Sequence, residues 1–475
     1  TRRGIGRQMD HSADAVSSRI RATLSTRYFT LTEAIGISVG FLVAVAGTHL
    51  LLRGADALLG GTLKLSATWP ISVFYFHPFW TPAWAFALTV LATVALFVGL
   101  TYAVLRTDRR GVAPVLAAGL VLVLATNLLQ SYQGGFVGPI AGGYLTDYGG
   151  IQYYHDAITV TDPVRFVADY TAFQSDLKLH SRTHPPGAVL SIYVFHELLG
   201  EPGLIAVAIA TVATLLSGAS TYGLLCAYAD RDTARYATYL FLLLPATQVY
   251  FLASLDALIT AFVVTAVYAF TQVRSPVGPA VAAGCLFLAS FQTFLFVLIV
   301  PVLVGYELLS ERTLRRSAAV LGAVAAAYLA LYAALGFNYA ESFLVAARIE
   351  NEGASIFTRP LDYLVTRLEG ITELLVFLTP FVLALAVRGR RYLAVDRDLG
   401  RLFGLAAVAL LGVFAVGLFK TGETTRALLY FYPFFLLPAV AYMRRVDAGF
   451  ADRFLLATLV FGQTFAMQLV GYYFW

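Results

Sequence analysis

Residues 231–270 read RDTARYATYLFLLLPATQVYFLASLDALITAFVVTAVYAF, two largely apolar runs that are separated near Asp256. A membrane-spanning helix needs about 20 mainly apolar residues to cross roughly 30 Å of hydrocarbon. Runs of this kind recur along the 475 residues, of which 59% are hydrophobic and 13% are charged. A soluble protein carries about 25% charged residues. The composition therefore predicts an all-α polytopic membrane protein and excludes a disordered chain, a soluble multidomain enzyme and a disulfide-stabilised secreted domain.

The apolar runs predict about 13 transmembrane helices, at residues 33–53, 82–105, 112–130, 202–227, 235–254, 256–273, 278–291, 293–310, 316–336, 371–388, 402–419, 426–443 and 451–473. One broken helix over 278–310 is an open alternative that would change the parity of every later helix. The predicted division is a cytoplasmic tail (1–32), three helices (33–130), a first long outer loop with juxtamembrane helices (131–201), helices four to nine (202–336), a second long outer loop (337–370) and helices ten to thirteen (371–475).

The charge distribution predicts a cytoplasmic N-terminus. With that orientation, 23 of the 33 Lys and Arg residues lie on the inner side, together with only 12 of the 28 Asp and Glu residues. Short cytoplasmic loops of membrane proteins carry such an excess of Lys and Arg. The net charge of +5 therefore reflects membrane topology, and no nucleic-acid partner is expected. Both long loops fall outside, so any chemistry is expected on the extracytoplasmic face of a multi-pass integral membrane protein.

The first long outer loop concentrates acids, histidines and aromatic residues in segment 144–187, YLTDYGGIQYYHDAITVTDPVRFVADYTAFQSDLKLHSRTHPPG. Asp147 follows the third predicted helix closely, and a carboxylate near the membrane surface can be tuned as a general base. A solvated loop acid is the alternative interpretation of Asp147. Four tyrosines of the outer loops could stack on a sugar or line an acceptor groove, although aromatic residues are common at membrane interfaces: Tyr148, Tyr153, Tyr154 and Tyr363.

The histidines of this loop allow several interpretations. His180 and His184 are spaced i, i+4, which on a helix could present two imidazoles to one metal ion. Pro185 follows directly, and residues before proline avoid the helical region, so ligand positioning or interfacial placement competes with a zinc site. Residues 187–199 predict a short amphipathic helix that lies on the outer surface.

Charged residues also occur at the ends of the predicted spans. Asp256 lies between apolar runs, where a lipid-facing charge would be costly, so it is predicted to face a cavity or else to form the N-cap of the following helix. The outer side carries only ten Lys and Arg residues, and Lys420 and Arg426 bracket the sequence KTGETTR. Arg426 is either a residue of the functional site or an interfacial arginine whose guanidinium reaches to the polar head groups.

These features resemble the protein O-mannosyltransferase and aminoarabinose-transferase branch of the GT-C membrane glycosyltransferases. The resemblance covers residues 144–273. It rests on the acid early in the loop, the His-Pro-Pro at 184–186, the apolar helix after it, Pro245 near the end of one span and Asp256 opening the next. It implies transfer of one sugar, mannose being one candidate, from a dolichyl- or polyprenyl-phosphate donor to a lipid-linked glycan or protein, with inversion and an Asp base.

The resemblance implies roles by position. Asp147 is the implied base, but Asp-Tyr stands where members often have two adjacent acids, so Asp156 stays open as the base, and Asp256 would assist. The loop also starts after three predicted spans, whereas the family usually starts it after one. Relatives differ in metal dependence, and Mg²⁺ or Mn²⁺ is the candidate ion. The implied donor-phosphate residues are Arg426, Lys420, Arg182, Arg348 and Arg359, and the implied substrate-binding residues are His184, His180, His155, Tyr148, Tyr154 and Glu423.

Two functions of other classes compete with this one. A lipid-linked sugar transporter (a flippase) would need polar residues along the interiors of the spans and a pathway to both faces. A non-catalytic membrane assembly subunit would keep the fold without the chemistry. Many transporters are built from related halves, and no internal repeat is obvious in this sequence.

Overall fold

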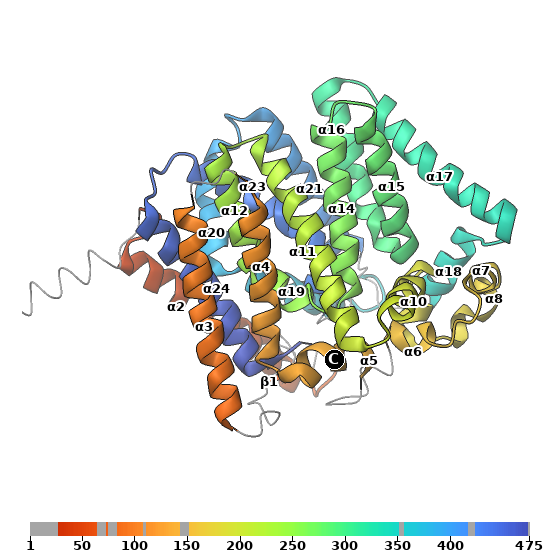
Figure 1. Ribbon diagram of the computed structural model, residues 1–475, viewed down its shortest axis with the longest axis horizontal. Helices are drawn as coiled ribbons and strands as arrows, with labels where there is room; N and C mark the ends of the chain where they lie inside the picture. Colours follow the sequence, from red (N-terminus) through yellow and green to blue (C-terminus); the bar gives the residue numbers. More distant parts are fainter. Residues whose placement is uncertain are drawn as a thin grey trace, which may run out of the picture.

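The computed structural model describes residues 27–63, 73–74, 83–107, 111–142, 152–350, 356–416 and 423–473, and these residues are almost entirely helical (Figure 1). The N-terminal helices are α2 (Leu31–Leu58), α3 (Ala83–Arg106), α4 (Ala113–Leu128), the π-helical turn η1 (Gln133–Val137) and α5 (Gly138–Ala141). The first predicted outer loop contains α6 (Tyr153–Ala157), α7 (Pro163–Ala168), α8 (Tyr170–Phe173), η3 (Gln174–Asp176), α9 (Leu179–Arg182) and α10 (Gly187–Leu199).

The remaining helices complete the bundle. They are α11 (Pro202–Cys226), α12 (Arg231–Leu243), α13 (Pro245–Tyr250), α14 (Leu255–Gln272), α15 (Val277–Gln292), η4 (Phe294–Ile299), α16 (Val300–Glu311), α17 (Arg315–Leu335), α18 (Tyr339–Glu350), α19 (Pro360–Leu378), α20 (Pro380–Gly389), η5 (Arg390–Tyr392), α21 (Arg397–Val416), α22 (Thr424–Ala427), η6 (Leu429–Phe431), α23 (Tyr432–Met443) and α24 (Phe450–Val470). Two short antiparallel strands, β1 (Val73–Phe74) and β2 (Gly471–Tyr472), pair with each other.

The helices confirm a polytopic membrane protein. Within the described residues, eight helices are long and apolar enough to cross a membrane, and up to ten if each of two bent pairs counts as one span. The prediction of about 13 spans exceeds this number. Each predicted run contains helix, but several of these helices are bent, divided or short. The helix α4 bends by 111° into η1 and α5, and α19 bends by 94° into α20. Pro245 divides the run 235–254 into two helices, and α15 and α23 are short.

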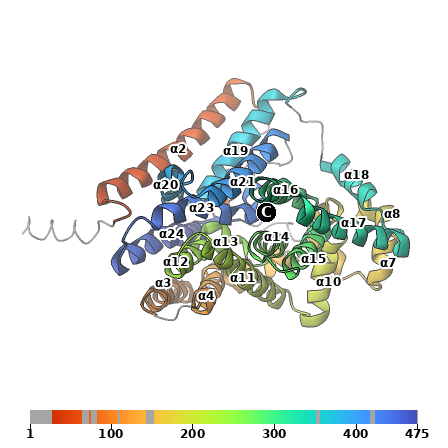
Figure 2. The ribbon, with the colours of Figure 1, turned by 90° about the horizontal axis from the view of Figure 1, so that it is seen from above.

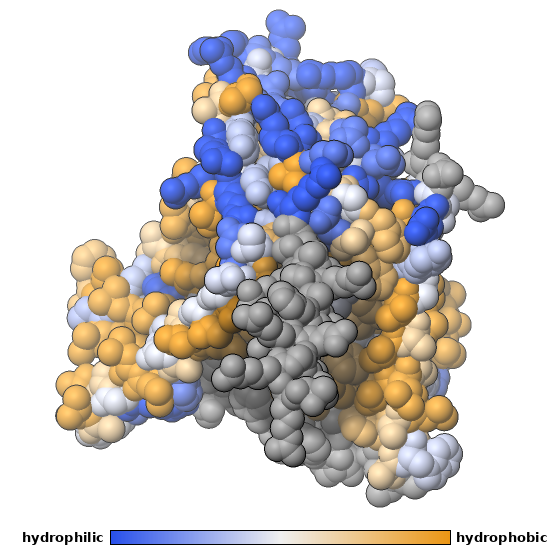
Figure 3. All heavy atoms as spheres, turned by 90° about the vertical axis from the view of Figure 1, so that its left-hand side faces the viewer, coloured by the Kyte–Doolittle hydropathy of each residue, from blue (hydrophilic) through white to orange (hydrophobic). Residues whose placement is uncertain are grey.

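The surface fits a membrane environment. Large apolar side chains on the outer helices are about two-thirds exposed, among them Leu42, Val43, Val408 and Leu411. Figure 3 shows polar side chains gathered at the upper end of one face, with mostly apolar surface on the flanks below. Seen from above, α2 lies along the edge of the bundle beside α20 (Figure 2). An apolar belt of this kind suits contact with lipid chains rather than water.

A cluster of buried amides crosses the centre of the bundle. α12 ends at Leu243 because Pro245 begins α13 and cannot continue the same hydrogen-bond ladder. The side chain of Gln248 donates to the carbonyl of Leu242. Its Oε1 accepts from Thr126 Oγ1 (3.0 Å), and its backbone carbonyl accepts from Asn127 Nδ2 (2.7 Å). These bonds satisfy polar groups that the break would otherwise leave unpaired in an apolar interior.

The same cluster extends to the last helix. Gln468 of α24 donates to Asn127 Oδ1 (3.1 Å), and Gln130 Nε2 donates both to Gln468 Oε1 (2.8 Å) and to the carbonyl of Gly471 (2.7 Å). Asn127, Gln130, Gln248 and Gln468 are at most 2% exposed. Side-chain amides therefore join α4, α13 and α24 across more than 300 residues of sequence.

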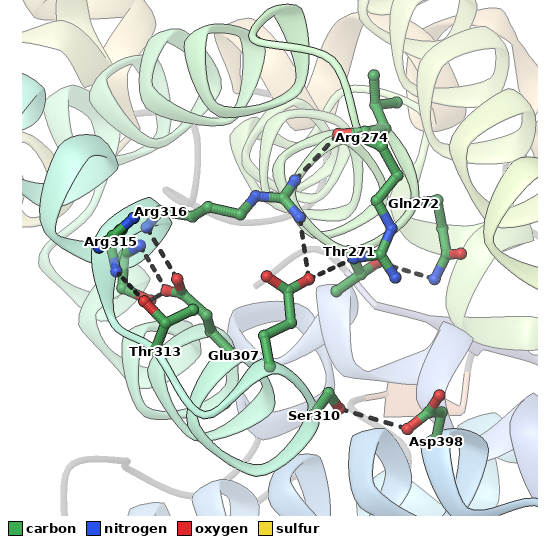
Figure 4. A network of polar contacts seen from close by, with 12 residues as sticks. Thr271, Gln272, Arg274, Glu307, Ser310, Thr313, Arg315, Arg316 and Asp398 are labelled. Atoms are coloured by element: carbon green, nitrogen blue, oxygen red, sulfur yellow. Dashed lines mark hydrogen bonds and ion pairs between the residues drawn. The ribbon is translucent and has the colours of Figure 1, made fainter.

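A second polar network joins α16 to α17 (Figure 4). Glu307 is 1% exposed, and its carboxylate accepts from the backbone N–H groups of Arg316 (2.8 Å) and Ser317 (2.7 Å). It thereby caps the first turn of α17, whose own N-cap position, Leu314, has no side chain that could accept. Beside it, Arg274 pairs with Glu311, so the network lies where α14 ends, opposite the end where α14 begins.

Candidate functional site

The start of α14 is built by a strained turn and a serine cap. Ala253 has a φ of +60°, an uncommon conformation for a residue with a side chain. Ser254 is the N-cap of α14, and its Oγ accepts from the backbone N–H of Asp256 (3.1 Å). The alternative that Asp256 caps this helix is therefore wrong, because Ser254 occupies the capping position.

The Asp256 carboxylate meets an arginine from the far end of the chain. Arg426 Nε lies 3.4 Å from Asp256 Oδ2, and Arg426 Nη2 lies 3.3 Å from Glu423 Oε1. The side chain of Arg426 is only 13% exposed, and that of Asp256 only 22%. A partly buried guanidinium between two carboxylates is held in one orientation, so Asp256, Glu423 and Arg426 form a single charged cluster.

This charged cluster opens onto a hollow that we call the recess. It is lined by Gln152, Tyr153, Ala253, Ser254, Leu255, Asp256 and Arg426. A second hollow shares Gln152, Tyr153, Ala253 and Leu255 and adds Pro139, Ile140, Tyr154 and Ile192. The two hollows adjoin, since they share four lining residues; the first carries the charged side chains, and the second is lined mostly by apolar and aromatic residues.

His184 stands beside the recess with a defined tautomer. Its Nδ1 lies 2.9 Å from the carbonyl oxygen of His180, and a carbonyl only accepts, so Nδ1 carries the proton. Its ring meets the recess residue Tyr153 edge to face, with ring centroids 5.4 Å apart. Burial lowers the pKa of His184 to about 4; the bond to His180 opposes that shift, and the positive charge of Arg426 adds to it. His184 is therefore neutral at physiological pH.

The pKa of His184 predicts acid sensitivity in this part of the fold. An unfolded histidine titrates near pH 6.5, so between about pH 6.5 and pH 4 the unfolded chain binds the extra proton. The stability contributed by the neutral imidazole is complete above pH 6.5 and is lost as the pH falls, by up to about 3 kcal/mol. Thermal unfolding at pH 7.0 and 4.5 should show a smaller loss for His184→Gln than for the native chain. An equal loss would contradict the prediction.

The other predicted site residues of the first outer loop make contacts outside the charged cluster. Asp156 Oδ2 accepts from the backbone N–H of Lys178 (3.1 Å) and so joins α6 to the start of α9. His155 Nε2 lies 3.0 Å from the carbonyl of Ala141, and Tyr154 lines the apolar hollow. The predicted helix at 187–199 is confirmed as α10, and α9 ends at Arg182, before the prolines, as the sequence indicates.

Some predicted residues are not brought to the recess. Arg359 lies 3.8 Å from Asp362, Arg348 is exposed in the last turn of α18, and Arg182 ends α9. None of these three arginines is among the described residues that line the two hollows. Three predicted site residues, Asp147, Tyr148 and Lys420, lie outside the described residues.

The described residues also do not fit a metal site built from side chains. Among them, no group of three or more His, Cys, Asp or Glu side chains is close enough to hold an ion. His184 directs Nδ1 to a carbonyl, and the positive charge between Asp256 and Glu423 is supplied by Arg426. The described side chains around the recess therefore supply no metal site of three or more ligands.

Comparison of the chain with models of protein families, with curated proteins and with solved structures gave no match. The assignment of a function consequently depends on the chemistry of the recess and on the arrangement of the helices around it.

Three residues at or beside the recess are absent from the site predicted from the sequence: Ser254, Gln152 and Glu373. Glu373 of α19 accepts from the backbone N–H groups of Thr424 and Thr425, immediately before Arg426. The sequence does contain a signal for Glu373, because an acid inside the apolar run of a predicted span usually faces the protein interior. Ser254 and Gln152 carry no comparable signal, since polar residues of this kind are common in turns.

Proposed function

We propose that this chain is an integral membrane glycosyltransferase. It moves one sugar from a dolichyl- or polyprenyl-phosphate donor to a lipid-linked glycan or protein on the extracytoplasmic face. The observation that carries the proposal is Arg426, which is held between Asp256 and Glu423 at a charged hollow that adjoins a mostly apolar one. An amphiphilic phosphate ester matches both hollows of such a site.

Arg426 is proposed to bind the donor phosphate. A guanidinium presents its N–H donors in a planar fork that suits phosphate oxygens. The flanking Asp256 and Glu423 fix the orientation of that fork before the donor binds. Negative charge grows on the phosphate as the bond to the sugar breaks, and an oriented cation in a partly dry site stabilises that change more than a solvated one.

The acceptor is proposed to be activated by a carboxylate of the loop. The base takes the proton of the acceptor hydroxyl, the hydroxyl oxygen forms a bond to the anomeric carbon, and the bond from that carbon to the phosphate oxygen breaks. Polyprenyl phosphate leaves with the electron pair, and attack from the opposite side inverts the anomeric configuration. Asp147 is proposed as the base rather than Asp156, since Asp156 already accepts from the backbone of Lys178.

Transfer by the purified protein tests this function. The full chain in lipid nanodiscs is given polyprenyl-phosphate sugars labelled in the sugar, with membrane lipid extracts and peptides as acceptors. We expect labelled product with inverted configuration, and a loss of about 10³-fold for Asp147→Asn, as for removal of a general base together with its charge. Asp162→Asn is the matched control, because Asp162 caps α7 in the same loop and asparagine caps equally well.

The competing functions give different results in the same preparation. Movement of the intact donor across proteoliposomes without transfer would indicate a flippase, and neither transfer nor movement would indicate an assembly subunit. Full activity of Asp147→Asn, or a retained anomeric configuration, would overturn the proposed mechanism.

A further inference from the structure

Glu373 forms hydrogen bonds to the backbone of the short segment that carries Arg426. Its side chain comes from α19 and is 3% exposed. Oε1 accepts from the backbone N–H of Thr425 (3.1 Å), and Oε2 accepts from that of Thr424 (3.3 Å). Both oxygens of one buried carboxylate are thus directed to the first turn of α22, and Arg426 is the next residue of that turn.

The packing around Glu373 keeps α19 and α22 close together. Gly370 lies one turn before Glu373, and a Cβ there would be only 2.7 Å from Thr424 Oγ1. On the other side, the Tyr432 hydroxyl lies 3.0 Å from the carbonyl of Leu374 and 3.2 Å from Thr425 Oγ1. The backbone of α22 is therefore held from two sides by groups that do not themselves line the recess.

α22 needs such external support. It has only four residues, and its N-cap residue, Glu423, makes no side-chain capping bond. A helix this short has no stability of its own, because nucleation costs more than one or two hydrogen bonds return. Glu423 instead directs its carboxylate to Arg426 (3.3 Å). The capping that Glu423 does not provide is provided by Glu373.

We propose that Glu373 is a positioning residue of this site: by binding the amides of Thr424 and Thr425 it sets the direction in which Arg426 meets a lipid-linked phosphate. This inference rests on the proposed function, in which Arg426 binds the donor phosphate. Glu373 does not touch the donor. It acts through the backbone of α22, so its effect on phosphate binding depends on the presence of the Arg426 guanidinium.

A double-mutant cycle tests this dependence. Binding of polyprenyl phosphate to the full chain in nanodiscs is measured for the native protein, Glu373→Gln, Arg426→Ala and the double variant. Glutamine places an amide N–H₂ against a backbone N–H, so one of the two bonds is lost. We expect about tenfold weaker binding for Glu373→Gln, in line with loss of a hydrogen bond to a charged group. In the Arg426→Ala background, Glu373→Gln should change the affinity by less than twofold.

Glu307→Gln is the matched control. Glu307 is equally buried and also accepts from two consecutive backbone amides (Figure 4), but it lies near the end of α14 and not near its start. Its replacement should lower the unfolding temperature about as much as Glu373→Gln and leave polyprenyl-phosphate affinity within twofold. Glu373→Asp keeps the charge on a shorter side chain and provides the same cycle if Glu373→Gln does not fold.

The outcomes separate the two proposals. Equal binding by the native protein and Arg426→Ala would overturn the assignment of Arg426 and with it the proposed function. Weaker binding by Arg426→Ala together with unchanged binding by Glu373→Gln would overturn only the positioning role. The positioning role would also be overturned if Glu373→Gln weakened binding equally with and without Arg426, since that result would indicate a general loss of structure.

Discussion

Arg426→Ala should lower the rate of sugar transfer from a polyprenyl-phosphate donor by about 10³-fold, because the developing charge on the leaving phosphate loses its oriented cation. Arg426→Lys should retain part of the rate, since lysine keeps the charge but not the planar fork. The measurement is single-turnover transfer in nanodiscs at saturating donor. A loss confined to donor affinity, with an unchanged rate at saturation, would show that Arg426 binds the ground state and the transition state equally.

The effect of Arg426→Ala on stability must be distinguished from its effect on sugar transfer. Arg426→Ala leaves the carboxylates of Asp256 and Glu423 next to each other, and both are at least two-thirds buried. Removing one partner of a buried ion pair is destabilising. The double variant Arg426→Ala with Asp256→Asn relieves this repulsion, and it should recover unfolding temperature without recovering transfer. Arg348→Ala, an exposed arginine of α18, is the control and should leave the rate within twofold.

Gly389→Ala should be the most damaging of the conservative changes to the fold. Gly389 ends α20, and a Cβ there would overlap the carbonyl oxygen of Pro438 in α23. A backbone carbonyl within a helix cannot rotate away as a side chain does, so α20 and α23 would have to separate. We expect a loss of about 3 kcal/mol, at the upper end of the usual cost of overpacking, measured as unfolding in detergent.

Gly404→Ala gives the comparison for this change. Gly404 lies inside α21, and no atom comes within 4 Å of the Cβ that alanine would add. Alanine is the better helix former, so Gly404→Ala should be neutral or slightly stabilising, by roughly 0.5 kcal/mol. If the two alanine variants had the same stability, the close packing of Gly389 on Pro438 could not be a determinant of the fold.

The apolar runs are sufficient to predict the helices but not their division into spans. Hydropathy identifies the residues that avoid water, and each predicted run contains helix in the described structure. Hydropathy carries no information about the direction of a helix axis. It therefore predicts neither the 111° bend after α4 nor the 94° bend after α19. The second bend lies at Thr379–Pro380, where proline ends the ladder of α19. Proline in an otherwise apolar run is thus a signal for a bend that hydropathy alone ignores.

The sequence predicts members of the site but not their connections. Asp256 and Arg426 are each recognisable separately, because each is a charge in apolar surroundings. Their 3.4 Å approach joins residues from distant parts of the chain, and no local pattern encodes such a pairing. Glu373 falls within the start of a predicted span, and its role depends on the backbone of α22, which is likewise distant in sequence.

The buried amides at the centre of the bundle impose an order on assembly. Asn127 of α4 and Gln130, two residues after that helix, are synthesised well before their partner Gln468 of α24. Until α24 enters the bundle, these early amides lack the hydrogen bonds that Gln468 and Gly471 supply. Polar groups without partners are costly in hydrocarbon. The entry of α24 into the bundle therefore completes the hydrogen bonding of amides that were inserted much earlier.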